Sequence, residues 1–115
     1  MCSERRMMSI QEERVKEYLE RYRIYKQMQD ADRYAKDYSS AEVPLCDSIV
    51  LQAKMNEIER FIRSLPVCRE QTLLFNHYIR GHSVDFCGEM MYVSRRTAYR
   101  IAKKGISLAA QYYAG

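Results

Sequence analysis

Residues 83–104, SVDFCGEMMYVSRRTAYRIAKK, constrain the fold more than any other part of the chain. Small or apolar residues recur in their first half at i, i+3, i+4 and i+7, the spacing of one helical face: Val84, Cys87, Gly88 and Met91. Glycine costs roughly 1 kcal/mol inside a helix relative to alanine, so Gly88 is better explained by close packing than by propensity. The pattern predicts a short helix that packs tightly against a second one.

A second helix is predicted to follow, because Ser83 and Ser94 stand where the two helices need N-caps. The turn between them, residues 91–93, has the three-residue length of a helix-turn-helix. The second helix is expected to continue past Gly105 to Tyr112 or Tyr113 and to pack back on the first helix of the chain. Its two sides differ. One is small and apolar, with Ala98, Ile101, Ala102, Gly105 and Ala109, and the other is polar, with Arg96, Tyr99, Arg100, Lys103, Lys104 and Ser107.

The polar side of this helix suits contact with duplex DNA, since no Asp or Glu occurs between Ser94 and Lys104. A helix fits the major groove, where Arg can bond guanine in a bidentate way, and the N-terminal residues of a recognition helix typically meet base edges. The candidates for base edges are Arg96 and Arg100, and the candidates for phosphates are Arg95, Lys103 and Lys104. Ser94 and Thr97 offer hydroxyls at a helix start that favours anions, and Tyr99 shares the face. The simpler alternative is a solvated basic surface.

Several segments between residues 62 and 104 resemble region four of bacterial sigma factors: residues 64–66 (SLP), 73–74 (LL), 78–81 (YIRG), Ser83 and 94–100 (SRRTAYR). They are more similar still to small phage and prophage proteins with a sigma-like helix-turn-helix, the late-operon regulators of the ArpU and RinA kind. The resemblance implies sequence-specific DNA binding and transcriptional control. Two residues depart from it. Tyr92 stands where a turn glycine is frequent, and Phe86 stands where a polar residue is usual.

Phe86 and Met90 lie four residues apart and off the predicted packing face of their helix. Large apolar side chains that are left exposed to water at such positions are unfavourable, so another surface is expected to bury them. We therefore expect them to dock on the N-terminal helices or on a partner protein such as RNA polymerase.

Two further helices are predicted upstream of Pro66. Residues 9–12, SIQE, form a capping box that opens a helix running to about Tyr38. Its apolar stripe is rich in tyrosine: Val15, Tyr18, Leu19, Tyr22, Tyr25 and Met28. After a connector at residues 39–44 and a cap at Asp47 or Ser48, a second helix has a seam of coiled-coil type: Leu51, Met55, Ile58, Ile62 and Leu65. The seam spans too few heptads to form a stable coiled coil by itself. It is therefore expected to pack on the first helix, on a second subunit, or on both.

The predicted fold class is all-α: two N-terminal helices, as a hairpin or coiled-coil-like pair, followed by a sigma region-four-like three-helix unit. Its supporting helix spans residues 69–80 and ends at Gly81, which suits a left-handed C-terminal position. We divide the chain into a helical packing or oligomerisation region, residues 1–66, and a helix-turn-helix DNA-binding region, residues 67–115. Residues 1–66 hold 12 basic and 12 acidic residues, whereas residues 67–115 hold 7 and 3. A polyanionic partner is therefore expected on the C-terminal region.

Other features bear on location and chemistry. No apolar run of 18 residues occurs, so no membrane-spanning helix and no membrane association are expected. The first residues are expected to be frayed. They lack an apolar signal region, which makes the cytoplasm the default location.

Cys2, Cys46, Cys68 and Cys87 show no paired ligand spacing and are expected as free thiols. His77, His82 and Cys87 recur every five residues, but Gly81 is expected to separate them, so no metal site is predicted. No catalytic residues, enzyme motif or cofactor are predicted.

The leading prediction is a phage- or prophage-derived, sequence-specific duplex DNA-binding transcriptional regulator that acts as a homo-oligomer, with a dimer favoured. One alternative is a DNA-packaging protein of the small-terminase type, which a ring-shaped oligomer would favour. The other is a protein-interaction adaptor without DNA binding, whose working surfaces would be the tyrosine stripe and the seam from Leu51 to Leu65.

Overall fold

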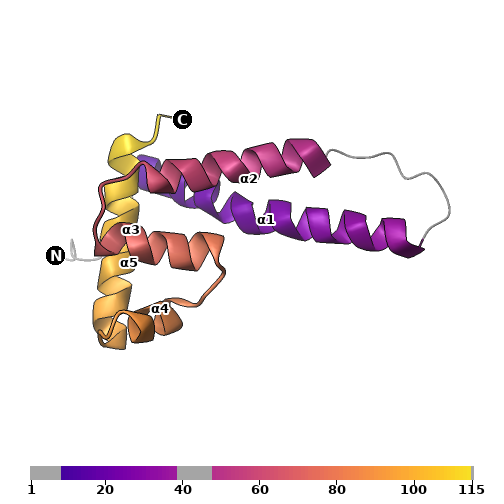
Figure 1. The fold of residues 1–115 in the computed structure, drawn as a ribbon. Coiled ribbons are helices and arrows are strands. Elements are labelled where there is room, and N and C mark those ends of the chain that lie inside the picture. The colour runs from indigo at the N-terminus through magenta and orange to yellow at the C-terminus, as the bar shows by residue number, and fades with distance from the viewer. Residues whose placement is uncertain (1–8, 39–47, 115) are drawn as a thin grey trace.

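The computed structural model describes residues 9–38 and 48–114, and the side chains of residues 9–31 and 49–114. Within these ranges the chain forms helices and no strand (Figure 1), so the predicted all-α class is confirmed for that part. The expectations about residues 1–8, the connector at 39–44, the cap at Asp47 or Ser48, and the thiols of Cys2 and Cys46 fall outside the described residues.

The first helix, α1, spans Ile10–Tyr38, as the sequence predicts. Its capping box is formed: the Glu12 N–H donates to Ser9 Oγ at 3.1 Å, and the Ser9 N–H donates to Glu12 Oε1 at 3.0 Å. These two bonds satisfy backbone donors that a helix start leaves without partners. The first turn of α1 is thereby fixed in place.

The second helix, α2, spans Ser48–Arg63 and lies antiparallel beside α1 (Figure 1). All five residues of the predicted seam are buried: Leu51, Met55, Ile58, Ile62 and Leu65. Ile58, Ile62 and Leu65 form one buried cluster with Val15 and Leu19 of α1, and Tyr18, Tyr22 and Tyr25 pack against this cluster. The seam therefore packs on α1 of the same chain. Met28, at the far end of the stripe, stays exposed.

The predicted helix over residues 69–80 is present but changes its winding. An α-helical part, α3, spans Arg69–Leu74, and a π-helical part, η2, spans Phe75–Ile79. The Arg80 N–H accordingly bonds the Phe75 carbonyl, five residues back, at 3.2 Å. The single α-helix expected from the sequence is therefore wrong in its last turn. Gly81 then adopts φ +79°, the left-handed conformation predicted for it.

The start of α3 also closes the end of α2. The side-chain amide of Gln71 lies 3.2–3.3 Å from the carbonyl oxygens of Ile62, Arg63 and Leu65. The last carbonyls of a helix have no partner within the helix, so this amide both satisfies them and sets the position of α3 relative to α2.

The last two helices are α4, Val84–Met90, and α5, Arg95–Tyr112. Both predicted N-caps are confirmed. The Ser83 hydroxyl accepts from the Phe86 N–H at 3.1 Å, and the Ser94 hydroxyl accepts from the Thr97 N–H at 3.2 Å. Four residues separate the helices, namely the predicted turn at 91–93 and the cap, Ser94.

Helix α5 crosses the base of the α1–α2 pair, while the far end of the pair extends away from it (Figure 1). One buried cluster joins these three helices and α3, and it includes Val15, Leu19, Ile58, Ile62, Leu74, Ile106 and Ala109. At the end of α5, Gln11 Nε2 donates to the Tyr113 carbonyl at 2.8 Å, and the Tyr18 and Tyr113 rings lie 5.0 Å apart. The C-terminal end of α5 thus packs on α1, as predicted. The core continues across the predicted boundary at Pro66.

In the part of the chain that the structure describes, no helix is both long and apolar enough to cross a membrane.

Candidate nucleic-acid interface

Close packing at Gly88 sets the angle between α4 and α5. A Cβ atom built on Gly88 would lie 2.7 Å from the Ala98 Cβ, closer than such atoms approach in proteins. Ala98 is itself fully buried, in a cluster with Leu73, Cys87 and Ile101. The expectation that Gly88 serves close helix packing is therefore confirmed.

The turn after α4 uses a left-handed residue, and that residue is Tyr92, with φ 59°. The Tyr92 N–H bonds the Glu89 carbonyl at 3.1 Å, and the Val93 N–H bonds the Gly88 carbonyl at 3.0 Å. This pair of bonds is the Schellman arrangement, in which glycine is the usual left-handed residue. The departure from glycine noted in the sequence thus coincides with a strained backbone, and the Tyr92 side chain is 95% exposed.

The cations predicted to contact DNA share one exposed surface of α5. Arg95, Arg96, Arg100, Lys103 and Lys104 are all exposed, and Tyr99 is half-exposed among them. For Arg96, Arg100, Lys103 and Lys104 the structure records no ion pair with any described residue. We call these five cations with Tyr99 the basic face of α5. It carries no carboxylate of its own helix.

The basic face ends one turn earlier than the sequence suggests, because the assignment of Ser107 to the outer side is wrong. Ser107 is half-buried, and its hydroxyl donates to Glu12 Oε2 at the start of α1. Helix α1 therefore packs on α5 at Ser107, and the cations of the basic face all lie within the first ten residues of α5.

Arg95 differs from its neighbours, since its Nε lies 3.2 Å from Asp85 Oδ1 in the first turn of α4. Asp85 Oδ1 is shielded from solvent and makes no hydrogen bond within the described residues. The positive charge of Arg95 therefore balances the negative charge on this oxygen. The guanidinium also lies 5.7 Å from the Tyr99 ring centroid. Because the Arg95 side chain is 76% exposed, a pair of this kind contributes at most about 1 kcal/mol. A phosphate can therefore compete for Arg95 at small cost.

The two hydroxyls at the start of α5 are not equivalent. Ser94 Oγ accepts from the Thr97 N–H and also donates to Thr97 Oγ1 at 3.0 Å. Its only proton is thus used within the cap. The Thr97 proton remains to be donated outward, so Thr97 is the better candidate for a phosphate contact.

Sequence reasoning missed one cation beside this surface. Lys16 of α1 lines a hollow together with Arg100, Lys103 and Lys104 of α5. Lys16 follows Val15 by one residue on α1, and no local pattern connects it with α5, 84 residues or more away. Lys16 lies beside these cations only because α1 packs on α5.

Phe86 and Met90 are 44% and 38% exposed, so the expectation that the N-terminal helices cover them is wrong. Helix α4 packs mainly on α5, with smaller contacts to α3 and η2, and this places α1 on another side. The Phe86 ring packs edge-on against the His82 ring, with 4.9 Å between the two ring centroids. Docking on a partner protein stays a prediction.

Cys68 and Cys87 are free thiols, and burial raises the pKa of Cys87. Nowhere in the described ranges do three or more His, Cys, Asp or Glu side chains gather in a way that could hold a metal ion.

His77 Nδ1 lies 2.7 Å from the His82 carbonyl oxygen. Because a carbonyl oxygen can only accept a hydrogen bond, Nδ1 is the donor.

Comparison with models of protein families, with curated proteins and with solved structures finds no match.

Proposed function

We propose that the chain is a sequence-specific duplex DNA-binding transcriptional regulator. In this proposal α4 and α5 are a helix-turn-helix supported by α3 and η2, and the α1–α2 pair is a helical hairpin that buttresses α5. The observation that carries the proposal is the basic face of α5, an exposed helix start with five cations and no acid. A helix of this kind enters the major groove with its first turns.

We propose different roles for the residues within the basic face. Arg96 and Arg100, four residues apart and without ion pairs to described residues, are proposed to reach base edges. Arg95, Lys103 and Lys104, with Thr97, are proposed to hold phosphates. Phosphate contacts position a protein on DNA, whereas base contacts specify the sequence.

The packing of the N-terminal helices favours this proposal over an adaptor. The adaptor interpretation needs the tyrosine stripe and the Leu51–Leu65 seam as free surfaces, but these two surfaces cover one another. An apolar surface does remain at Phe86 and Met90. Phage origin, the cytoplasm, dimer formation and contact with RNA polymerase stay predictions from the sequence.

Fluorescence anisotropy with a labelled mixed-sequence duplex, measured across a salt series, tests the proposal. Wild-type affinity should fall steeply with salt, because each phosphate contact releases counterions. The double variant Arg96→Ala/Arg100→Ala should weaken binding by about tenfold and make it less dependent on salt, because two cations are lost from the surface that meets the duplex.

The matched control is Arg21→Ala/Arg23→Ala, which removes the same two charges from exposed positions on α1. It should weaken binding by no more than about threefold, through net charge alone. Equal losses in the two double variants would reject α5 as the groove-facing helix. No binding by the wild type at about 50 mM salt would reject DNA binding itself.

A further inference from the structure

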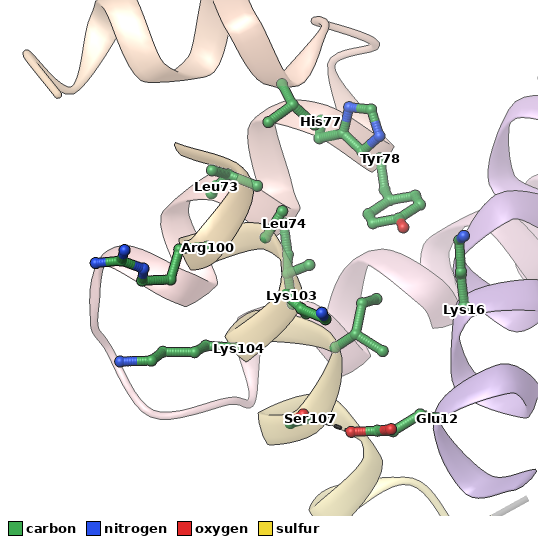
Figure 2. Close-up of a pocket in the computed structure, with 13 residues that line it drawn as sticks. Glu12, Lys16, Leu73, Leu74, His77, Tyr78, Arg100, Lys103, Lys104 and Ser107 are labelled. Atoms are coloured by element: carbon green, nitrogen blue, oxygen red, sulfur yellow. Dashed lines mark hydrogen bonds between the residues drawn. The ribbon is translucent and has the colours of Figure 1, made fainter. Parts of the chain in front are cut away.

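A hollow of about 460 Å³ lies where α1, η2 and α5 meet (Figure 2). Its size falls within the range of sites that hold small organic ligands. Three elements line it from different directions: Lys16 comes from α1, Tyr78 from η2, and Lys103 from α5. Arg100 and Lys104 stand at its edge, and in Figure 2 their side chains extend away from α1.

The charges around the hollow are mostly positive and mostly uncompensated. Neither Lys16 nor Lys103 forms an ion pair with any residue in the described ranges. The only carboxylate in the lining belongs to Glu12, whose two oxygens already accept hydrogen bonds from the Ser9 N–H and the Ser107 hydroxyl. Lys16, Arg100, Lys103 and Lys104 thus share the lining with a single carboxylate, that of Glu12, and the excess of positive charge favours an anion.

Tyr78 adds a hydroxyl donor to this space. Burial first, and the Glu20 carboxylate second, raise the pKa of Tyr78 to about 12. The hydroxyl therefore keeps its proton at neutral pH and can donate it. Figure 2 shows this hydroxyl directed toward the side of the hollow where Lys16 lies.

Apart from His77, the remainder of the lining is apolar. Leu73 and Leu74 form a buried floor, and Val84 and Ala102 are partly exposed above it. A ligand that fits both parts needs an anionic group and a flat apolar portion. We propose that the hollow binds a phosphorylated small molecule, with its phosphate between Lys16, Lys103 and the Tyr78 hydroxyl, and its apolar portion against Val84 and Ala102.

Such a ligand would connect α1 to α5 beside the basic face. Two hydrogen bonds, Glu12 to Ser107 and Gln11 to Tyr113, already hold these helices together on one side of the hollow. A phosphate in the hollow joins them through charge as well. The same chemistry is present in the phosphodiester backbone of DNA, so a bound phosphate has two sources, a free small molecule or a duplex.

Isothermal titration of the full chain with 1-naphthyl phosphate tests the site without DNA, and so its outcome does not depend on the proposed function. We expect a Kd of about 0.1–1 mM for a ligand of this size. Lys16→Gln and Lys103→Gln should each weaken binding about tenfold, because each removes a charge-assisted hydrogen bond. Lys26→Gln, at an exposed position of α1 outside the hollow, should leave affinity unchanged.

Three results would overturn the proposal: no heat of binding at 5 mM ligand, equal binding of the uncharged 1-naphthol, or equal losses in the Lys26→Gln control. Thermal unfolding of each variant checks that the exposed lysines are replaced without loss of the fold. A titration repeated with saturating duplex then distinguishes the two sources. Displacement by the duplex identifies the bound group as a backbone phosphate, and an unchanged Kd identifies the hollow as a separate small-molecule site.

Discussion

The chain contains two helix pairs that are held together in opposite ways. The α1–α2 pair is long, and large side chains separate its backbones along the Leu51–Leu65 seam. The α4–α5 pair is short and brings its backbones together at Gly88 and Ala98, with only Leu73, Cys87, Ala98 and Ile101 fully buried around the contact. The first pair buries the larger side chains, and the second fixes the orientation of the basic face.

This difference predicts different sensitivities. A seam of large side chains tolerates changes of shape but loses free energy when atoms are removed. A contact between Gly88 and Ala98 has only one side-chain carbon to lose and no space for another. Deletions should therefore damage the α1–α2 pair most, and additions should damage the α4–α5 pair most.

The largest effect is expected from Ile62→Ala in α2. Ile62 is fully buried in the cluster that joins α1, α2 and α5, so its truncation leaves a cavity and should lower the free energy of unfolding by about 2–5 kcal/mol. Urea unfolding followed by circular dichroism measures this change. The control is Ile49→Ala on the same helix, where the side chain is 85% exposed and the cost should stay below about 0.5 kcal/mol.

If the two isoleucine variants lose similar stability, then the seam does not stabilise the fold and the comparison between the pairs fails. A loss confined to the helices α1 and α2, with α5 unaffected, would also contradict the single shared cluster. Amide hydrogen exchange resolved by residue would detect it.

A smaller effect on stability, with a larger one on DNA binding, is expected from Gly88→Ala. The added Cβ would lie 2.7 Å from the Ala98 Cβ, which cannot move without its backbone. Overpacking of this kind costs about 1–3 kcal/mol, only partly offset by the better helix propensity of alanine. Because α4 must shift relative to α5, binding in the anisotropy assay should weaken beyond what the loss of stability explains.

Gly105→Ala is the matched control, since it adds the same atom to α5 itself. There the new Cβ would lie 3.1 Å from Leu74 Cγ and Cδ2 and 3.4 Å from the Glu70 carbonyl oxygen, so its neighbours need to shift by only a few tenths of an ångström. Its effect on the free energy of unfolding should stay within about 1 kcal/mol of zero. A Gly105→Ala variant less stable than Gly88→Ala would place the critical close contact between α5 and α3 instead.

Local patterns predicted much of this fold. Periodicity located α1 and the α2 seam, and serine caps located the starts of α4 and α5, because these features depend on neighbours within one or two turns. The exposed positions of Arg96 and Arg100 also followed from the spacing on α5. Their contact with DNA stays a prediction.

Most of the features that sequence reasoning missed join residues from different helices. The Ser107–Glu12 bond spans 95 residues, and Lys16 reaches the hollow through the same packing of α1 on α5. The Asp85–Arg95 pair depends on how closely α4 approaches α5. No spacing rule carries such information, since it resides in the tertiary arrangement. The π-helical turn η2 likewise has no local signal in residues 75–79.

The smallest effect is expected at the turn that joins the close-packed pair. Tyr92 has φ 59° and a side chain that is almost fully exposed, so Tyr92→Gly removes backbone strain and little packing. A left-handed conformation costs a non-glycine residue about 1–2 kcal/mol, and the extra freedom of glycine in the unfolded chain returns roughly 0.5–1 kcal/mol of that. The free energy of unfolding should therefore rise by about 0.5 kcal/mol, measured as a higher urea midpoint with an unchanged slope.

The control is Gly81→Ala, at the other left-handed position, where the added Cβ would lie in open space. This variant should shift the urea midpoint in the opposite direction. If Tyr92→Gly lowers stability instead, the tyrosine ring holds the turn through contacts with α4 or α5, and the close-packed pair depends on one large side chain after all.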